Sequence, residues 1–286
     1  MSRTADLHVH TSWSDGTDSV AELFAAAQAA GLTTLGMTDH DTAAHWDQAR
    51  ELVPAGMRVL PGAEFSTKHP GADGELVSVH LLGYLFDRTD PAIVAEWERM
   101  RAERAGRGGK IVANLVAAGF PITAERVQEI AGRSAVSRPH IARALMEAGV
   151  VGSVGEAFAE LLDENGPYYA ALRSLPLTEA VELVTAAGGV PVLAHPRARA
   201  AAAVLTADVI AGLVPLGLRG LEVEHPDHDD AARAELAGIA AELELLQTGS
   251  SDYHGENKTL RIGQERTSDE VVEQIIDLGA IAPFSA

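Results

Sequence analysis

The first strand expected from the sequence carries two histidines whose spacing could hold a metal ion. In the segment DLHVHTSWSDGT at residues 6–17, His8 and His10 stand two positions apart. Alternate side chains of a strand point to the same face, so the two imidazoles lie together while the apolar residues of the strand pack behind them. With Asp15 in the following turn, this is a plausible start to a metal site. A surface coincidence or a hydrogen-bonded histidine pair is the alternative interpretation.

Further strands and helices alternate along the chain and would position such residues. Seven strands are expected outside a central segment, one at the start of the chain and the others at residues 32–37, 57–62, 76–85, 189–194, 220–223 and 245–248. Helices are expected at residues 20–30, 43–52, 177–187, 201–216, 229–243 and 269–278. Polar residues follow the strands, which is the pattern of a barrel or an open parallel sheet with its site at the C-terminal ends of the strands.

The metal-competent residues on and after these strands are too many for one ion. They are His8, His10, Asp15, His40, Glu64, His80, His195, Asp252 and His254. A mononuclear site needs three or four protein ligands, whereas two or three closely spaced ions that share carboxylates would use the whole set. Such sites hydrolyse phosphate esters by making hydroxide at neutral pH and by clamping the attacking and leaving oxygens.

The alternation stops between about residues 87 and 173. Only helical patterns occur there, at residues 91–119, 123–131, 138–148 and 154–162. We interpret this stretch as an inserted helical subdomain. The expected organisation is a barrel in two parts, residues 1–87 and 174–286, with an insert at 88–173 that binds substrate. Gly106 and the pair at 108–109 are expected to weaken or kink the first helix of the insert.

Composition limits the classes of protein to consider. The chain has 286 residues, a formal net charge of −19 and no cysteine. The charge argues against affinity for the backbone of extended nucleic-acid duplexes. The lack of cysteine excludes disulfides and thiolate-ligated zinc. No signal core and no membrane-length apolar run occurs, so a soluble cytoplasmic protein is expected, with no membrane association and no obligate protein partner evident.

Six fragments in order resemble the PHP family, the polymerase and histidinol phosphatase superfamily. They are DLHVHTSWSDGT (6–17), TDHDT (38–42), GAEFS (62–66), VHLLGY (79–84), LAHP (193–196) and SSDYHG (250–255). The resemblance implies an α/β fold, a distorted (β/α)7 TIM-like barrel with an inserted helical subdomain. It also implies a trinuclear metal centre at the C-terminal face of the strands, and no ligand position departs from the family pattern.

The resemblance assigns the ligands to three ions, with Glu64 bridging two of them. The implied sets are His8, His10, Glu64 and Asp252 for the first ion, Asp15, His40 and His254 for the second, and Glu64, His80 and His195 for the third. Manganese, zinc and iron all suit such ligands. Asp15 and His195 are also expected to be catalytic. The leaving oxygen would take its proton from a metal-bound water, from His195 or from His228.

The insert carries the signature SRPH at residues 137–140. This signature resembles the branch whose characterised members act as 3',5'-nucleoside bisphosphate phosphatases and as 5'-to-3' exonucleases on short RNA. Ser137, Arg138 and His140 at a helix start would grip a phosphate. The same residues also suit an ordinary helix cap.

Further candidates have a structural alternative. Arg104 and Arg107 lie on one face of the first insert helix, where they could bind substrate or pair with neighbouring glutamates on a solvated face. Arg197 follows His195 and could touch substrate, and His228 in the segment EVEHPDH could reach the phosphate, although a structural role is equally compatible. His45 has no pattern around it and is expected at the surface.

The sequence therefore predicts a metal-dependent phosphoesterase. Its expected substrate is a small phosphorylated nucleotide, a 3',5'-nucleoside bisphosphate, or a 5'-phosphorylated short oligoribonucleotide, which a metal-activated hydroxide attacks in line. Two alternatives stay open. One is a histidinol-phosphatase-like phosphomonoesterase, and the other is a non-catalytic accessory module whose metals are structural.

Overall fold

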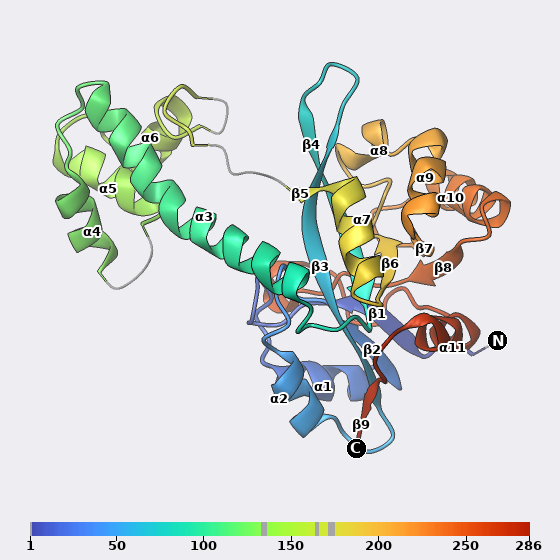
Figure 1. Cartoon of the computed structure of the whole chain (residues 1–286). Helices are drawn as coiled ribbons and strands as arrows, with labels where there is room; N and C mark the ends of the chain where they lie inside the picture. Colours follow the sequence, from blue (N-terminus) through green and yellow to red (C-terminus); the bar gives the residue numbers. More distant parts are fainter. Residues whose placement is uncertain (1, 133–135, 164–165, 171–174) are drawn as a thin grey trace. The chain divides into compact units, whose positions relative to one another are not determined.

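The computed structural model describes residues 2–132, 136–163, 166–170 and 175–286, and Figure 1 shows its elements. Seven strands form one continuous sheet in the order β1 (Ala5–Val9), β2 (Thr34–Met37), β3 (Arg58–Pro70), β4 (Leu76–Tyr84), β6 (Val190–Leu193), β7 (Gly220–Glu224) and β8 (Leu246–Gly249). A parallel bridge between Val9 and Tyr253, just past β8, brings the first and last strands together. The sheet is nearly closed, which confirms the predicted seven-stranded barrel.

β3 and β4 form a long hairpin, so the alternation of strands and helices expected from the sequence does not hold between these two strands. The two strands pair antiparallel from Gly62 and Tyr84 to Pro70 and Leu76, and β4 is also antiparallel to β6. The physical reason is the short connection at residues 71–75, because a parallel crossover needs a dozen or more residues. Figure 1 shows the hairpin extending beyond β5 (Leu175–Pro176), a short strand that pairs with β3, as does β9 (Phe284–Ser285).

The helices that accompany the sheet mostly lie where the sequence predicts them. They are α1 (Val20–Ala29), α2 (Trp46–Leu52), α7 (Leu177–Ala186), α10 (Asp230–Glu242) and α11 (Asp269–Leu278). The prediction of a single helix at residues 201–216 is wrong. This segment instead forms α8 (Ala201–Val204), α9 (Ala207–Leu213) and a 3-10 turn (Val214–Leu216). Thr206 is extended and its side chain accepts a hydrogen bond from Val209 N, so it begins α9 as a new helix.

The core between the sheet and α11 is apolar. Its buried side chains include Leu7, Leu60, Leu82, Val192 and Ile275. Tyr84 is fully buried as well, and its hydroxyl donates a hydrogen bond of 2.9 Å to the carbonyl oxygen of Leu7. This bond satisfies the only polar atom of the side chain, so the ring can pack within the core.

The chain divides into two compact units, residues 1–94 with 174–286, and residues 95–173. The second unit contains most of α3 (Pro91–Ala117) together with α4 (Ala124–Ala131), α5 (Arg138–Glu147) and α6 (Val154–Glu160). Its helices enclose a separate core that includes Ile111, Leu115, Val127, Ile141 and Leu145. α3 continues through its glycines as one helix. Among the described helices, none combines the length and the apolar character that crossing a bilayer requires.

Candidate metal centre

β1 and β3 bring two histidines and a glutamate together inside the barrel. His8 and His10 are fully buried and Glu64 is 1% exposed. The Nε2 atoms of the two histidines lie 3.0 Å apart, and each is 3.1 Å from Oε2 of Glu64. The predicted arrangement, with both imidazoles on one face of the first strand, is confirmed. His40, just after β2, brings its Nε2 atom to 3.3 Å from the same oxygen.

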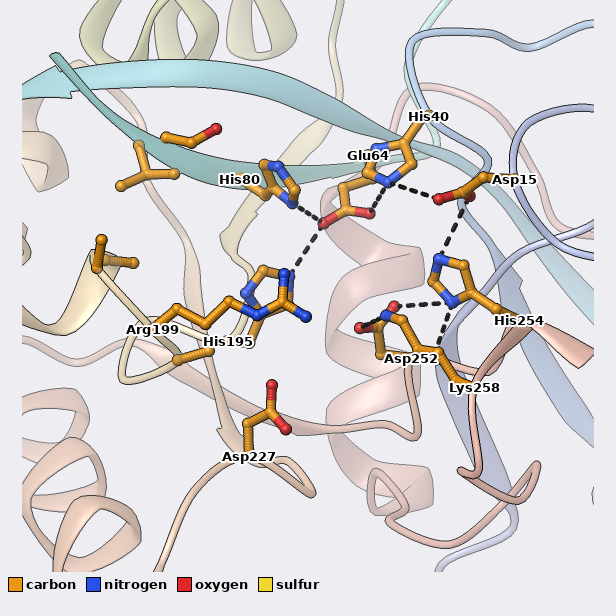
Figure 2. Close-up of a pocket in the computed structure, with 15 residues that line it drawn as sticks. Asp15, His40, Glu64, His80, His195, Arg199, Asp227, Asp252, His254 and Lys258 are labelled. Carbon is orange, nitrogen blue, oxygen red and sulfur yellow. Dashed lines mark hydrogen bonds and ion pairs between the residues drawn. The ribbon is translucent and has the colours of Figure 1, made fainter. Parts of the chain in front are cut away.

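Two further histidines approach the other oxygen of Glu64. Nδ1 of His80 lies 2.6 Å and Nε2 of His195 lies 3.1 Å from Oε1, and Figure 2 shows both rings directed at the carboxylate. The antiparallel register pairs Ser66 with His80, so Glu64 and His80 are diagonal neighbours across the hairpin. The hairpin therefore explains how a histidine from the middle of a strand reaches the site.

Asp15 and Asp252 supply the remaining carboxylates. Oδ1 of Asp15 lies 3.3 Å from Nε2 of His254, and Figure 2 shows Asp15 between the rings of His40 and His254. The side chain of Asp15 is 53% exposed, whereas Asp252 is buried. Oδ2 of Asp252 forms a salt bridge with Nζ of Lys258. The site thus has one carboxylate open to solvent and one held against a lysine.

Among the described residues, three groups of donor atoms are close enough to hold metal ions, with all ligand atoms of a group within 4.8 Å of one another. They are His8, His10, Glu64 and Asp252; His10, Asp15, His40 and His254; and His40, Glu64 and His80. The first group is the same as the ligand set that the family resemblance implies for the first ion. The second group is the set implied for the second ion, with His10 added. The third group has His40 where the implied set has His195, whose Nε2 still contacts Glu64.

The chemistry of these donors fits divalent ions. Each group contains only imidazole nitrogen and carboxylate oxygen, which suit zinc, manganese and iron. Glu64 lies buried against histidines and, within the described part of the chain, forms no ion pair with a lysine or arginine. Burying a carboxylate is costly unless positive charge compensates it. A bound divalent cation would supply that charge.

The charges in the cluster shift its pKa values strongly. Burial disfavours the protonated form of His10, but hydrogen bonds with Asp252 and Glu64 outweigh it and raise its pKa to about 9. Against its burial, nearby carboxylates including Glu64 also raise the pKa of His8 well above its ordinary value. Burial would raise the pKa of Glu64, but the surrounding histidines hold it well below its ordinary value. When no ion is bound, protonated His8 and His10 therefore offset part of the negative charge of the carboxylates at neutral pH.

These shifts predict that metal binding releases protons. A histidine must lose its proton at the ligating nitrogen before it can bind an ion, and the pKa of His10 is about 9. Affinity should therefore rise with pH up to about 9 and fall as pH drops towards 6, by roughly tenfold per pH unit for each proton displaced. Calorimetric titration with Zn²⁺ in buffers of different ionisation enthalpy counts these protons. Binding without proton release between pH 6 and 8 would contradict the prediction.

Glu222 on β7 supports the cluster from behind. It is fully buried, its Oε1 atom lies 3.2 Å from Nδ1 of His8, and its Oε2 atom accepts a 2.6 Å hydrogen bond from the backbone N–H of His195. Ser250 donates its hydroxyl hydrogen to the same carboxylate. A carboxylate behind a ligating histidine fixes the ring orientation. Sequence reasoning missed this role, although an acid within an apolar strand was a usable signal.

Asp39 and His45 fix the loop that carries Asp15. Asp39 accepts hydrogen bonds from Thr11 N at 2.9 Å and from Ser14 Oγ at 2.6 Å. His45 is fully buried, with Nδ1 3.2 Å from Oδ2 of Asp39. The expectation that His45 lies at the surface is therefore wrong, because the carboxylate of Asp39 provides a polar partner inside the barrel.

His228 and Arg197 occupy the wall near the site. Nδ1 of His228 donates a 3.0 Å hydrogen bond to Val223 O, and Nε2 accepts one of 3.2 Å from the backbone N–H of Arg197. Both ring nitrogens are therefore engaged. Arg197 donates to both carboxylate oxygens of Glu235, at 3.0 and 2.9 Å. The catalytic role of His228 and the substrate contact of Arg197 stay predictions, and these contacts favour structural roles.

A cavity of about 400 Å³ opens over the cluster. Seven of the nine expected ligands line it: Asp15, His40, Glu64, His80, His195, Asp252 and His254. Arg199, Asp227 and Lys258 line it as well, and Figure 2 shows Arg199 beside His195, Lys258 beside Asp252, and Asp227 below them. Sequence reasoning assigned no role to Arg199 or Asp227.

The SRPH segment begins α5 in the helical unit. Nδ1 of His140 accepts a 3.2 Å hydrogen bond from the backbone N–H of Ser137, and the Ser137 hydroxyl lies 3.0 Å from the same nitrogen. The two residues form a capping box. The guanidinium of Arg138 lies over the rings of Phe158 and Tyr169, at 5.4 and 5.7 Å from their centroids. The segment is thus a capped helix start whose arginine lies over aromatic side chains.

The basic face of α3 is partly engaged in local contacts. Arg107 donates a hydrogen bond of 3.3 Å to the hydroxyl of Tyr169. Arg99 pairs with Glu96 and Glu103 on the same helix, as the solvated-face interpretation expects. Arg104 belongs to α3, but its side chain lies outside the part of the chain that is described. The substrate role of this face therefore stays a prediction.

Curated relatives support a phosphoesterase. The chain is 31% identical to the 5'-3' exoribonuclease of Haemophilus influenzae, covering 89% of this chain and 91% of that protein. It is 33% identical to a phosphoribosyl 1,2-cyclic phosphate 1,2-diphosphodiesterase of Eggerthella lenta, over 87% and 94% of the two chains. It is 29% identical to the 3',5'-nucleoside bisphosphate phosphatase of Chromobacterium violaceum, over 87% and 86%. All three names describe the hydrolysis of phosphate esters.

The fold and the family agree with this chemistry. A solved structure from Bifidobacterium adolescentis, provisionally named a metal-dependent phosphoesterase, superposes with a TM-score of 0.73 at 33% identity and covers 98% of both chains. The sequence profile of the PHP domain matches residues 6–169, more than half of the chain. The buried groups of histidines and carboxylates suit the metal dependence of such enzymes. The chain therefore belongs to the PHP domain family and is a metal-dependent phosphoesterase.

Proposed function

We propose that this enzyme removes phosphate from 3',5'-nucleoside bisphosphates and from 5'-phosphorylated short RNA. The observation that carries the proposal is the buried cluster around Glu64, which opens to a cavity of about 400 Å³. The names of the Haemophilus and Chromobacterium relatives support the two substrate classes. The SRPH segment at the start of α5 supports recognition of a phosphate.

The residues present would hold three divalent ions, of manganese, zinc or iron. His8, His10, Glu64 and Asp252 would bind the first, Asp15, His40 and His254 the second, and Glu64, His80 and His195 the third. When bound, such ions lower the pKa of water and neutralise charge on phosphoryl oxygens.

The protein's own groups then orient the substrate and handle protons. Asp15 is the most exposed carboxylate of the cluster, so it can accept a hydrogen bond from the attacking water and orient that water in the cavity. Burial opposes its ionisation, but contacts with His254, His40 and His10 hold its pKa well below the ordinary range, which keeps it ionised. We propose His195 as the group beside the leaving oxygen, and Ser137, Arg138 and His140 as phosphate contacts.

A second candidate is hydrolysis of a cyclic phosphodiester. The Eggerthella relative, named for that reaction, is 33% identical, more than the 29% of the bisphosphate phosphatase. The same ligand groups would serve either reaction, so the pocket outside them decides between the substrates.

A direct comparison of substrates tests the proposal. Purified protein with Mn²⁺ is given adenosine 3',5'-bisphosphate, a 5'-phosphorylated short RNA, histidinol phosphate and a ribose 1,2-cyclic phosphate. Preference for the bisphosphate or the RNA supports the proposal. Preference for histidinol phosphate or for the cyclic phosphate would keep the metal chemistry and reject the substrate. Failure to hydrolyse any of them with metal bound would favour an accessory module.

Arg138→Met is expected to lower kcat/KM for the preferred nucleotide by about 10-fold or more, because a charged hydrogen bond to phosphate is lost. Steady-state phosphate release measures the effect. Arg143→Met, an exposed arginine on the same helix, is the matched control. Equal activity of the two variants would remove Arg138 from the proposed phosphate contacts.

A further inference from the structure

Two cations line the cavity, and only one of them is engaged by a carboxylate. Lys258 forms a salt bridge with the ligand Asp252. Arg199 lines the same cavity and is exposed. Across the part of the chain that the structure describes, its guanidinium forms no salt bridge or hydrogen bond. Arg199 is therefore available to an anion that enters the cavity.

Arg197 offers a contrast two residues earlier. Its side chain is 9% exposed, and besides its contacts with Glu235 it donates a 2.8 Å hydrogen bond to the carbonyl oxygen of Leu205. These bonds fix Arg197 in the wall, and it is not among the residues that line the cavity. Of the two arginines close to His195, Arg197 is therefore held in the wall, whereas Arg199 lines the cavity.

The backbone that leads to Arg199 is held in an uncommon conformation. His195 has a φ of 28° and Arg199 a φ of 50°, in the left-handed region that costs a residue with a side chain about 1 kcal/mol or more. The hydrogen bond from His195 N to Glu222 fixes the start of this segment. Such strain is concentrated at functional sites. Figure 2 shows the guanidinium of Arg199 beside the ring of His195.

We propose that Arg199 binds the second, non-scissile phosphate of the substrate, an inference that rests on the proposed function. The ligand groups face the phosphate that is cleaved, so a cation on the cavity wall outside them serves another anionic group. A guanidinium can form two parallel hydrogen bonds with a phosphate. The chain carries a net charge of −19, which repels polyanions unless a local cation compensates it. Arg199 thereby favours substrates with two phosphates over simple monoesters.

The test compares substrates with and without a second phosphate. Arg199→Met removes the charge and keeps the length, and Arg199→Gly removes the charge while suiting the left-handed backbone, so a folding defect is separated from a binding defect. Both variants are expected to lower kcat/KM for adenosine 3',5'-bisphosphate by about 10- to 100-fold. Their kcat/KM for p-nitrophenyl phosphate should stay within about threefold, because that substrate has no second phosphate. A 5'-phosphorylated dinucleotide shows whether RNA uses the same contact.

Arg219→Met is the matched control, since this exposed arginine precedes β7, at the opposite end of the strand from the site. An equal loss on all substrates, or none on the bisphosphate, would overturn the assignment of Arg199. If the wild-type protein hydrolyses p-nitrophenyl phosphate but neither nucleotide, the proposed function fails separately. The inhibition constant of the bisphosphate against p-nitrophenyl phosphate then tests Arg199. A rise of about tenfold supports the contact, whereas an unchanged constant or no inhibition by the wild type overturns it.

Discussion

Glu64→Gln is expected to lower kcat/KM for every phosphate substrate by about 1000-fold or more. Glu64 belongs to two of the three groups of possible ligands, and its oxygens contact the histidines of four strands or strand ends at 2.6 to 3.3 Å. Glutamine keeps the shape of the side chain but removes the charge that balances ions in both groups. The loss should therefore appear in metal binding as well as in turnover.

Metal content after dialysis, measured beside steady-state phosphate release, checks this prediction. The variant should retain fewer equivalents of Mn²⁺ or Zn²⁺ than the wild type at the same free concentration. Glu75→Gln is the matched control, because Glu75 is exposed in the turn of the β3–β4 hairpin. Wild-type metal content, or activity within tenfold of the wild type, would show that Glu64 does not organise the centre.

Gly36→Ala is expected to lower the free energy of unfolding by about 3 kcal/mol or more. Gly36 lies in β2, where a Cβ atom would stand 2.3 Å from the carbonyl oxygen and 2.8 Å from the Cα atom of Leu7. These are backbone atoms of β1, so no rotamer change can relieve the overlap and the two strands must separate. Because β1 carries His8 and leads directly into His10, the metal centre should be disturbed along with the stability.

Thermal unfolding of the metal-free protein measures the effect, and a melting temperature lower by about 5 °C or more corresponds to that loss. Gly238→Ala is the matched control. Gly238 lies inside α10, where an added Cβ meets no atom within 4 Å, so alanine should stabilise the helix by about 0.5 to 1 kcal/mol. A Gly36→Ala protein as stable as the wild type would mean that β1 and β2 can part without cost.

Much of the fold could be predicted from local pattern. Each of the seven strands of the barrel path lies at an expected apolar run, and α11 matches its expected range of 269–278. Hydrophobic periodicity and helix caps are properties of neighbouring residues, so the sequence reports them directly. The pairing of β4 was not predictable in this way. Strand direction depends on which strands meet, and the hairpin was visible only in the short connection after β3.

The same distinction between local pattern and tertiary contacts applies to the candidate metal site. Residue type alone selected the nine expected ligands, since histidines and carboxylates after successive strands are hard to explain otherwise. The three-dimensional structure decided how they group, with His10 and His40 close to two clusters each. It also decided the supporting residues, because Glu222 contacts His8 although the two residues are 214 positions apart in the chain.

The clearest division concerns the two arginines after His195. The sequence by itself determined the chemistry of this protein, which is a metal-assisted attack on phosphate esters. The types of the ligand residues and their order along the chain are properties of the sequence. Only the tertiary structure decided that Arg197 pairs with Glu235 while Arg199 lines the cavity. The direction of a side chain depends on backbone dihedral angles and on partners from distant segments, and neither can be read from the order of residues.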